Sequence, residues 1–258
     1  MTADAERTGE AAAPVVVTLA AYGRVVDLEV PEALVGPVTS RLPPGYTVVS
    51  SSGDPDRRWS LGPDGDVGRL WSEVELWVAD QAEGRVFVHA GCVAIEGRAI
   101  LVPGRTMTGK STLTAALVRA GASYLSDEYA VLDAEGQVWP YPRDLSVREG
   151  GIGRRYPIEH FGGAAAEGPV AVALVASLRF EPGAAWDVEA TSAAAGVLAL
   201  LDNTVSARSH PAEALAATAA VARSATFLQG RRGDAGRAAM ELLSAVVGRW
   251  TVGPSAWS

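Results

Sequence analysis

One motif constrains this chain more than any other feature: residues 104–111 read Gly-Arg-Thr-Met-Thr-Gly-Lys-Ser. Two glycines at this spacing, followed by lysine and serine, are typical of a phosphate-binding loop, whose backbone N–H groups surround the phosphates of a nucleotide. Lys110 is the only lysine among the 22 lysine and arginine residues of the sequence. Because arginine is the cation everywhere else, this position indicates a need for the compact ammonium that contacts β- and γ-phosphates as a point charge. The alternative interpretation is a glycine-rich surface loop.

The neighbours of the motif favour the first interpretation, because a phosphate-binding loop lies between a buried strand and the start of a helix. Residues 99–102 form a short apolar run that ends at Pro103, which predicts a core strand. Leu113 and Leu117 follow at helical spacing, and Gly121 predicts the end of that helix. The N–H groups at the helix start and the helix dipole would attract phosphates. We expect ATP to be bound by Gly104, Thr106, Thr108, Gly109, Lys110, Ser111 and Thr112.

Composition and charge limit the classes of partner. The chain has 258 residues and a formal net charge of −8, and its longest basic runs are pairs of arginines. A nucleic acid or an anionic membrane is therefore not expected as a partner. The single cysteine, Cys92, excludes an internal disulfide, and we interpret it as a small buried residue rather than a nucleophile. With no signal segment and no apolar stretch of membrane-spanning length, the sequence predicts a cytoplasmic protein.

The distribution of apolar runs, proline and glycine along the chain predicts two folded domains and two tails. We expect a disordered leader over residues 1–13, a small β-rich domain over 14–68, a P-loop domain over 69–250 and a tail over 251–258. In the first domain, short apolar runs separated by proline and glycine predict strands at residues 15–17, 25–30 and 46–49. The pattern of apolar residues then predicts an amphipathic helix over residues 69–82, which we assign to the P-loop domain.

The strand that leads into the motif has a predicted partner next to it in sequence. The two-residue turn Glu96-Gly97 joins apolar runs at 86–95 and 98–102, which favours an antiparallel hairpin. Further strands are predicted at residues 123–126, 129–132, 137–139 and 170–180, and about three helices in the alanine-rich remainder. Residues 150–168 are interpreted either as a mobile loop that closes over the nucleotide or acceptor, or as a surface connection. Arg231 and Arg232 are assigned to a solvated face, and the alternative is a contact with the nucleotide or the substrate.

Two acidic residues occur one strand after the motif. Asp127 and Glu128 follow the run at 123–126, where phosphoryl-transfer proteins place a base or a metal-holding carboxylate. With Ser111 they are the candidate Mg²⁺ ligands; the alternative makes the two carboxylates solvated residues at a strand end. Taken by itself, His89 at the end of an apolar run fits a core histidine satisfied by hydrogen bonds. Arg143 and Arg148 are candidates for stabilising the transferred charge or for surface ion pairs.

Four blocks of sequence, in this order, resemble the HPr kinase/phosphorylase group, and more closely the HPr-kinase-related proteins of peptide-modification gene clusters. The blocks are His89-Ala90-Gly91, residues 104–112, Leu125-Ser126-Asp127-Glu128 and Trp139-Pro140-Tyr141-Pro142-Arg143. The resemblance covers roughly residues 65–150 well and the remainder weakly. It implies that Asp127 is the general base on an acceptor serine hydroxyl and that His89 lies beside the reacting phosphate. It also matches Lys110 and Ser111 to the loop residues of the family, and Glu128 to a second acidic position that supports metal binding.

Two positions depart from the family pattern. Met107 stands where the loop has glycine, and Ser146 stands where the Leu-Glu-Ile-Arg stretch of the bifunctional enzymes has glutamate, which predicts kinase activity without efficient phosphorolysis. The sequence thus predicts an α/β protein with an HPr kinase-like P-loop sheet, flanking helices and a small N-terminal β-rich domain. Its expected activity is ATP- and Mg²⁺-dependent phosphorylation of a hydroxyl, with a serine of a peptide or small protein as acceptor. The alternatives are a small-molecule kinase and a catalytically silent nucleotide-binding partner protein. In all three cases the protein could be a homo-oligomer.

Overall fold

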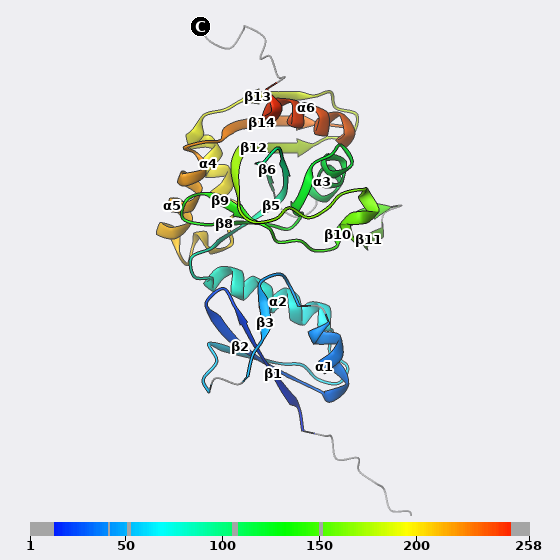
Figure 1. The fold of residues 1–258 in the computed structure, drawn as a ribbon, viewed down its shortest axis with the longest axis vertical. Helices are drawn as coiled ribbons and strands as arrows, with labels where there is room; N and C mark the ends of the chain where they lie inside the picture. The colour runs from blue at the N-terminus through cyan, green and yellow to red at the C-terminus, as the bar shows by residue number, and fades with distance from the viewer. Residues whose placement is uncertain (1–12, 41, 51–52, 105–107, 150–151, 249–258) are drawn as a thin grey trace, which may run out of the picture. The chain divides into compact units, whose positions relative to one another are not determined.

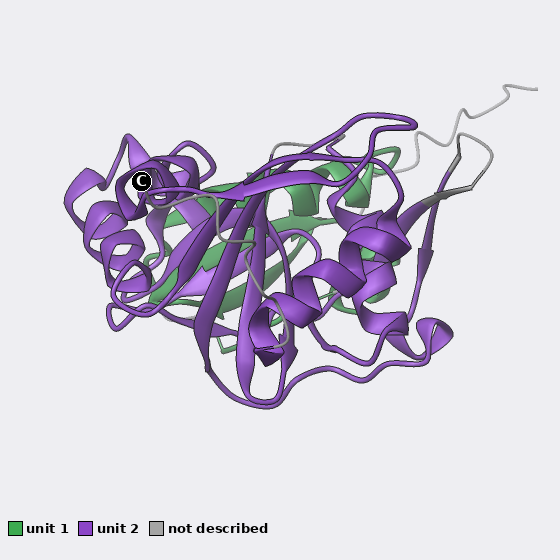
Figure 2. Cartoon of the chain, turned by 90° about the horizontal axis from the view of Figure 1, so that it is seen from above, with its two compact units in different colours: residues 1–78 green, residues 79–258 purple. Residues whose placement is uncertain are grey.

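The computed structural model describes residues 13–40, 42–50, 53–104, 108–149 and 152–248, without the side chains of residues 148, 149 and 152. The chain divides into two compact units, residues 1–78 and residues 79–258, which Figure 2 distinguishes by colour. The loop residues Thr106 and Met107, predicted above to matter for nucleotide binding, lie outside the described residues.

The first unit is a four-stranded sheet with two helices. Its elements are β1 (Val15–Ala21), β2 (Arg24–Val30), α1 (Glu32–Thr39), β3 (Tyr46–Val48), β4 (Arg57–Ser60) and α2 (Val67–Gln81). The strand order is β3-β1-β2-β4, and β1 and β2 form an antiparallel hairpin. Tyr22 and Gly23 at its turn both have positive φ, which is the backbone geometry that fits the twist of a two-residue hairpin.

Helix α2 packs within the first unit. Its buried residues Leu70, Trp71, Val74 and Val78 belong to the same hydrophobic cluster as the inward-facing residues of β1 and β2. The sequence predicts the domain boundary before this helix, between residues 68 and 69, whereas the structure divides the chain within it, after Val78. The physical reason is that a four-stranded sheet leaves an apolar face to be covered, and the apolar stripe of α2 covers it.

The second unit is built on an eight-stranded mixed sheet, as the α/β prediction requires. Its strands are β5 (Val86–Ile95), β6 (Arg98–Pro103), β7 (Ser123–Ser126), β8 (Tyr129–Leu132), β9 (Gln137–Trp139), β12 (Val170–Phe180), β13 (Asp187–Ala190) and β14 (Thr226–Arg232). Their order is β13-β14-β12-β6-β5-β8-β9, and β7 pairs with β5 beside β8. Strands β6, β12 and β14 are parallel to one another, whereas β5 is antiparallel to β6 through the predicted Glu96-Gly97 turn. The predicted hairpin is therefore confirmed.

Helices cover both faces of this sheet (Figure 1). They are α3 (Lys110–Arg119) and α6 (Ala235–Val247) on one face, and α4 (Ala193–Leu201) and α5 (Pro211–Val221) on the other. In β6, Ile100 and Val102 belong to the cluster under α3 and α6, while Ala99 and Leu101 belong to the cluster under α4 and α5. A strand buried on both faces is apolar at every position, which is why this stretch of sequence is a continuous apolar run.

The segment after β9 forms a separate two-stranded hairpin of β10 (Leu145–Glu149) and β11 (Ile152–Tyr156), followed by the short 3₁₀ helices η1 (Ile158–Phe161) and, later, η2 (Val205–Ala207). Part of the loop predicted over residues 150–168 is thus a strand and a helical turn. The many glycines hid this hairpin, because they weaken any strand pattern. In the described ranges, no helix combines the length and the apolar character that crossing a membrane requires.

Candidate active site

The motif joins the end of β6 to the start of α3, the strand and the helix that its sequence context predicts. Gly104, directly after β6, donates its N–H to the carbonyl of His89 over 3.1 Å. Gly109 precedes the first helical residue, Lys110, with φ of 78°. A Cβ on Gly109 would lie 2.8 Å from Nη2 of Arg232, so both the backbone angle and the space demand glycine here.

A cavity of about 620 Å³ opens at the start of α3. The predicted site residues that line it are His89, Gly109, Lys110, Ser111, Thr112, Asp127 and Glu128. The structure therefore brings together residues from three separate blocks of the sequence. Thr108 lines a second cavity and packs against Gly104, whose added Cβ would lie 2.8 Å from the Thr108 hydroxyl oxygen. Arg148 lies on β10 opposite Gly153, a residue of the cavity wall, but its side chain is outside the described part of the structure.

Asp127 occupies the bend between β7 and β8, and only 8% of it is exposed. The hydroxyl of Tyr124 donates to Oδ1 over 2.8 Å, and the N–H of Ser146 donates to Oδ2 over 3.3 Å. Burial, reinforced by the charge of Asp127, raises the pKa of Tyr124, so that its hydroxyl keeps its proton and remains a donor. The carboxylate is thus held in one orientation at the cavity wall and is not a solvated strand-end group.

Glu128 has a more open environment than its neighbour. Its side chain is 46% exposed and pairs with Nη1 of Arg143 over 3.1 Å, and the arginine side chain is 21% exposed. An ion pair with this much solvent contact contributes little to stability. Arg143 therefore matches the ion-pair alternative, and Glu128 is a carboxylate that can exchange one cationic partner for another.

His89 lies on β5, beside the loop. Its backbone N–H donates to the backbone carbonyl of Asn203 over 2.7 Å, and the centre of its ring lies 4.8 Å from that of Tyr129. Burial, together with the positive charge of Lys110, lowers the pKa of His89, so the imidazole is neutral near pH 7. Burial also lowers the pKa of Lys110, while Asp127 and the adjacent glutamate oppose that effect. The cavity therefore holds a desolvated ammonium near carboxylates and a neutral imidazole.

The helix that carries the lysine approaches β5 closely. A Cβ added to Gly91 would lie 2.5 Å from Oγ1 of Thr114 and 3.7 Å from Cβ of Lys110. Thr114 is fully buried in α3. The glycine of the His89-Ala90-Gly91 block thus sets the distance between the strand and the first turn of the helix, and thereby the position of the lysine.

The sequence misses one buried cation at this site. Arg232, assigned above to a solvated face, is only 2% exposed. Its Nη2 donates to the carbonyl of Gly109 over 2.8 Å and its Nη1 to the carbonyl of Gly233 over 3.3 Å. The guanidinium carbon lies 5.3 Å from the ring of Phe180, and burial lowers the pKa of the arginine. The prediction holds for Arg231, whose side chain is 53% exposed and pairs with carboxylates.

Had the sequence predicted β14, it would also have predicted that Arg231 and Arg232 differ in burial. Successive side chains of a strand point to opposite faces, so one member of an arginine pair on β14 must point into the sheet packing. Two further residues of the cavity wall, Arg155 on β11 and Phe180 at the end of β12, also carry no sequence signal of their own. They reach the cavity because the hairpin of β10 and β11 and the end of β12 border it.

The oxygen atoms at the cavity fit a hard divalent cation. Ser111 supplies a hydroxyl, and Asp127 and Glu128 supply carboxylates, from the wall of one cavity. Mg²⁺ prefers such ligands and usually takes only one or two carboxylates, with phosphates and waters completing its shell. Over the described residues, no group of three or more histidine, cysteine, aspartate or glutamate side chains is arranged to hold a metal ion without such help.

Comparisons with known proteins find a likeness among solved structures. No family model matches the sequence, and no curated protein matches it. Among solved structures, the chain is similar to the Hpr(Ser) kinase/phosphatase from Coxiella burnetii, with 18% sequence identity and a TM-score of 0.36. The likeness covers 63% of this chain and 94% of that one. A likeness of this size leaves the reaction to be inferred from the residues of the cavity.

Proposed function

We propose that this protein is an ATP- and Mg²⁺-dependent kinase that transfers the γ-phosphoryl group to a hydroxyl, with a serine of a peptide or small protein as the acceptor. One observation carries the proposal. The cavity at the start of α3 is lined both by the loop residues Lys110 and Ser111 and by the buried carboxylate of Asp127. Phosphoryl transfer needs little more than a cradle for the phosphates and a positioned carboxylate for the attacking hydroxyl.

In this reaction, Asp127 accepts the proton of the acceptor hydroxyl. The oxygen then forms a bond to the γ-phosphorus while the bond between that phosphorus and the β,γ-bridging oxygen breaks, and ADP leaves with the bonding electrons. Tyr124 and the backbone of Ser146 hold the carboxylate toward the cavity through their hydrogen bonds. Lys110 neutralises negative charge on the phosphates, and the N–H groups of the first helical turn contribute to the same end.

The metal would be held by Ser111, Asp127 and Glu128, whose oxygens line the same wall. Bound there with the nucleotide, Mg²⁺ would neutralise phosphate charge and align the transferred group. Arg155, exposed at the rim of the cavity, adds positive charge on the side of the β10 and β11 hairpin. The resemblance to kinases of peptide-modification clusters supports a peptide acceptor. The experiment below distinguishes a peptide acceptor from a small-molecule acceptor.

The test is mass spectrometry of candidate peptides and proteins encoded beside this gene, after incubation with ATP and Mg²⁺. Wild-type protein should add one phosphate to a serine of one candidate. Asp127→Asn should still bind ATP, measured by calorimetry, but should lose phosphorylation by about 10²–10⁴-fold, the usual contribution of a positioned base. Lys110→Ala should lose ATP binding as well.

Asp144→Asn is the matched control, since Asp144 is exposed and lies outside the cavity wall. This variant should phosphorylate as wild type does. If Asp127→Asn retains full phosphorylation, the assigned base is wrong. If wild type binds ATP and modifies no peptide, the acceptor is a small molecule or the protein is a nucleotide-binding partner without turnover.

A further inference from the structure

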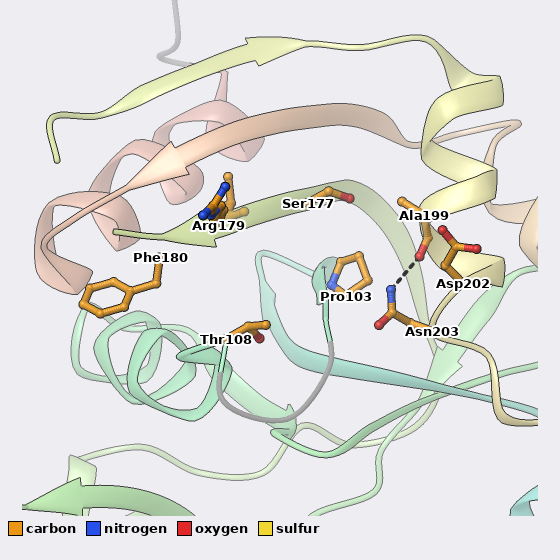
Figure 3. A pocket seen from close by; sticks show the side chains of 9 residues that line it. Pro103, Thr108, Ser177, Arg179, Phe180, Ala199, Asp202 and Asn203 are labelled. Carbon is orange, nitrogen blue, oxygen red and sulfur yellow. Dashed lines mark hydrogen bonds between the residues drawn. The ribbon is translucent and has the colours of Figure 1, made fainter. Parts of the chain in front are cut away.

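A second cavity of about 400 Å³ borders the same loop (Figure 3). The first cavity lies where the loop enters α3, whereas the second lies where the loop leaves β6, at Pro103 and Thr108. Its other walls are the last residues of β12 and the end of α4 with the two residues that follow, Asp202 and Asn203. None of the candidate catalytic residues described above lines this cavity.

Among the described residues that line them, the two cavities share one, Phe180, at the end of β12. Figure 3 shows Phe180 and Asn203 on opposite sides of Pro103, so the second cavity extends from the shared aromatic ring along β12 toward α4. A ligand that passes Phe180 can therefore occupy both cavities at once. The volume of the second cavity falls within the range of about 300–1,000 Å³ that is usual for small-molecule sites.

The second cavity is lined by one cation, Arg179, and one carboxylate, Asp202, and its uncharged polar groups suit a hydrogen-bonding ligand. The side-chain amide of Asn203 donates through Nδ2 to the carbonyl of Ala199 over 2.8 Å, which fixes the orientation of the amide. Its Oδ1 is buried and has no hydrogen-bond partner among the described residues. A buried acceptor without a partner is costly, so Oδ1 is suited to accept an N–H or O–H from a ligand.

The charges distinguish the two ends of such a ligand. The carboxylate of Asp202, next to Asn203, disfavours a phosphate nearby and can accept a hydrogen bond from an N–H of the ligand. Ser177 and Thr108 add hydroxyls, and the exposed ring of Phe180 offers a flat apolar surface. In the first cavity, by contrast, Lys110 and the helix start attract phosphates.

We infer that the second cavity binds the nucleoside half of the nucleotide, with the base at the Asn203 end, accepting its N–H on Oδ1, and the sugar beside Thr108 and Pro103. This inference rests on the proposed function, because that function places the terminal phosphate in the first cavity. If the γ-phosphate lies beside Asp127, the rest of the nucleotide extends out of the first cavity past Phe180. The second cavity is the adjoining space, and its groups match a sugar and a base.

The test compares a probe that carries a nucleoside, ADP, with a probe that carries none, inorganic tripolyphosphate, each with Mg²⁺ and titrated calorimetrically into the full-length protein. Ala199→Phe fills the cavity and should weaken ADP binding by about tenfold or more while tripolyphosphate binding changes by less than about twofold. Asn203→Ala removes the acceptor and should weaken ADP binding by about three- to tenfold, the usual effect of one hydrogen bond. Leu198→Phe is the matched control, since Leu198 is the preceding residue of α4 and is 62% exposed, and it should bind both probes as wild type does.

The outcomes separate the inference from the function on which it rests. If the variants bind ADP as tightly as wild type does, or if ADP and tripolyphosphate binding fall together in a folded variant, the nucleoside lies elsewhere and the inference is wrong. If wild type binds neither probe, the proposed kinase function fails, and the inference fails with it. Circular dichroism establishes that each variant is folded, and Asn203→Ala, which removes atoms and adds none, decides the matter if Ala199→Phe does not fold.

Discussion

Replacing Gly91 with alanine tests whether the close approach of β5 to α3 determines the position of Lys110. The new methyl group would lie 2.5 Å from Oγ1 of Thr114, far inside an ordinary van der Waals contact. Thr114 is fully buried, and its hydroxyl has no hydrogen-bond partner among the described residues. Either the threonine rotates in a packed core or the first turn of α3, with Lys110, moves away from β5.

The expected cost follows from two opposing effects. Overpacking a buried site costs about 1–3 kcal/mol. Removing a glycine from the unfolded chain returns about 0.4–1 kcal/mol, because alanine has fewer conformations to lose. Gly91→Ala should therefore lower the free energy of unfolding by about 1.3 kcal/mol at the middle of the two ranges, and by about 2.6 kcal/mol at most. Urea unfolding of the second unit, with an unchanged dependence on urea concentration, measures this difference.

A second substitution identifies the cause. Thr114→Ala removes the oxygen that the new methyl group meets, so the double variant should recover most of the loss, which a double-mutant cycle reports as a favourable coupling. Thr114→Val keeps a heavy atom at that place and should recover none of it. Equal recovery with valine and with alanine, or a Gly91→Ala protein as stable as wild type, would refute the steric explanation.

Three other predictions concern groups described above. Burial lowers the pKa of His89, so the folded chain binds a proton less readily than the unfolded chain below about pH 6.5, and the free energy of unfolding should fall as the pH decreases through this range. His89→Gln should flatten that part of a pH series of urea unfolding curves, and an unchanged profile would show that His89 is not the group responsible. Arg232→Met removes a buried cation along with its hydrogen bonds, so calorimetry should show ADP affinity falling by about 10- to 100-fold while urea unfolding shows little change, since the relieved desolvation offsets the lost bonds. Asp133→Ala should destabilise the second unit by about 2–4 kcal/mol in thermal or urea unfolding, because the buried carboxylate accepts from two backbone N–H groups of its turn and from the indole of Trp139; a loss under about 1 kcal/mol would show that water replaces these bonds.

The sequence predicts the parts of this fold that follow a simple period. The apolar runs of β5, β6 and β12, the turn between β5 and β6, and the helix after the loop all occur where the pattern places them. Their signals are strong because these elements are buried, so nearly every position along them is constrained by packing. Of the helices after β12, α4 and α5 are rich in alanine and have only weak apolar stripes, so the sequence predicts the approximate number of helices there but not their bounds.

Elements at the edges escape prediction for a related reason. Strands β4 and β13 are short and mostly exposed, so few of their positions must be apolar. Strand β14 is half polar in sequence, and its last residue, Arg232, is buried where the loop carbonyl of Gly109 accepts a hydrogen bond from it. A local sequence pattern cannot predict a hydrogen-bond partner that is more than a hundred residues away in sequence. The cavity at Asn203 has the same origin, since its walls come from three distant segments.

The antiparallel pairing of β5 with β6 has a consequence for how the site assembles. A two-residue turn connects these strands, and the pairing leads directly to the hydrogen bond between the carbonyl of His89 and the N–H of Gly104. Contacts between residues close in sequence cost little loop-closure entropy and are favoured to form early, whereas the parallel pairings of β12 with β6 and β14 close long loops. The imidazole and the loop glycine can thus be in register before the strand that ends at Phe180 has joined the sheet. We therefore expect the wall of the first cavity at His89 to form before the wall at Phe180.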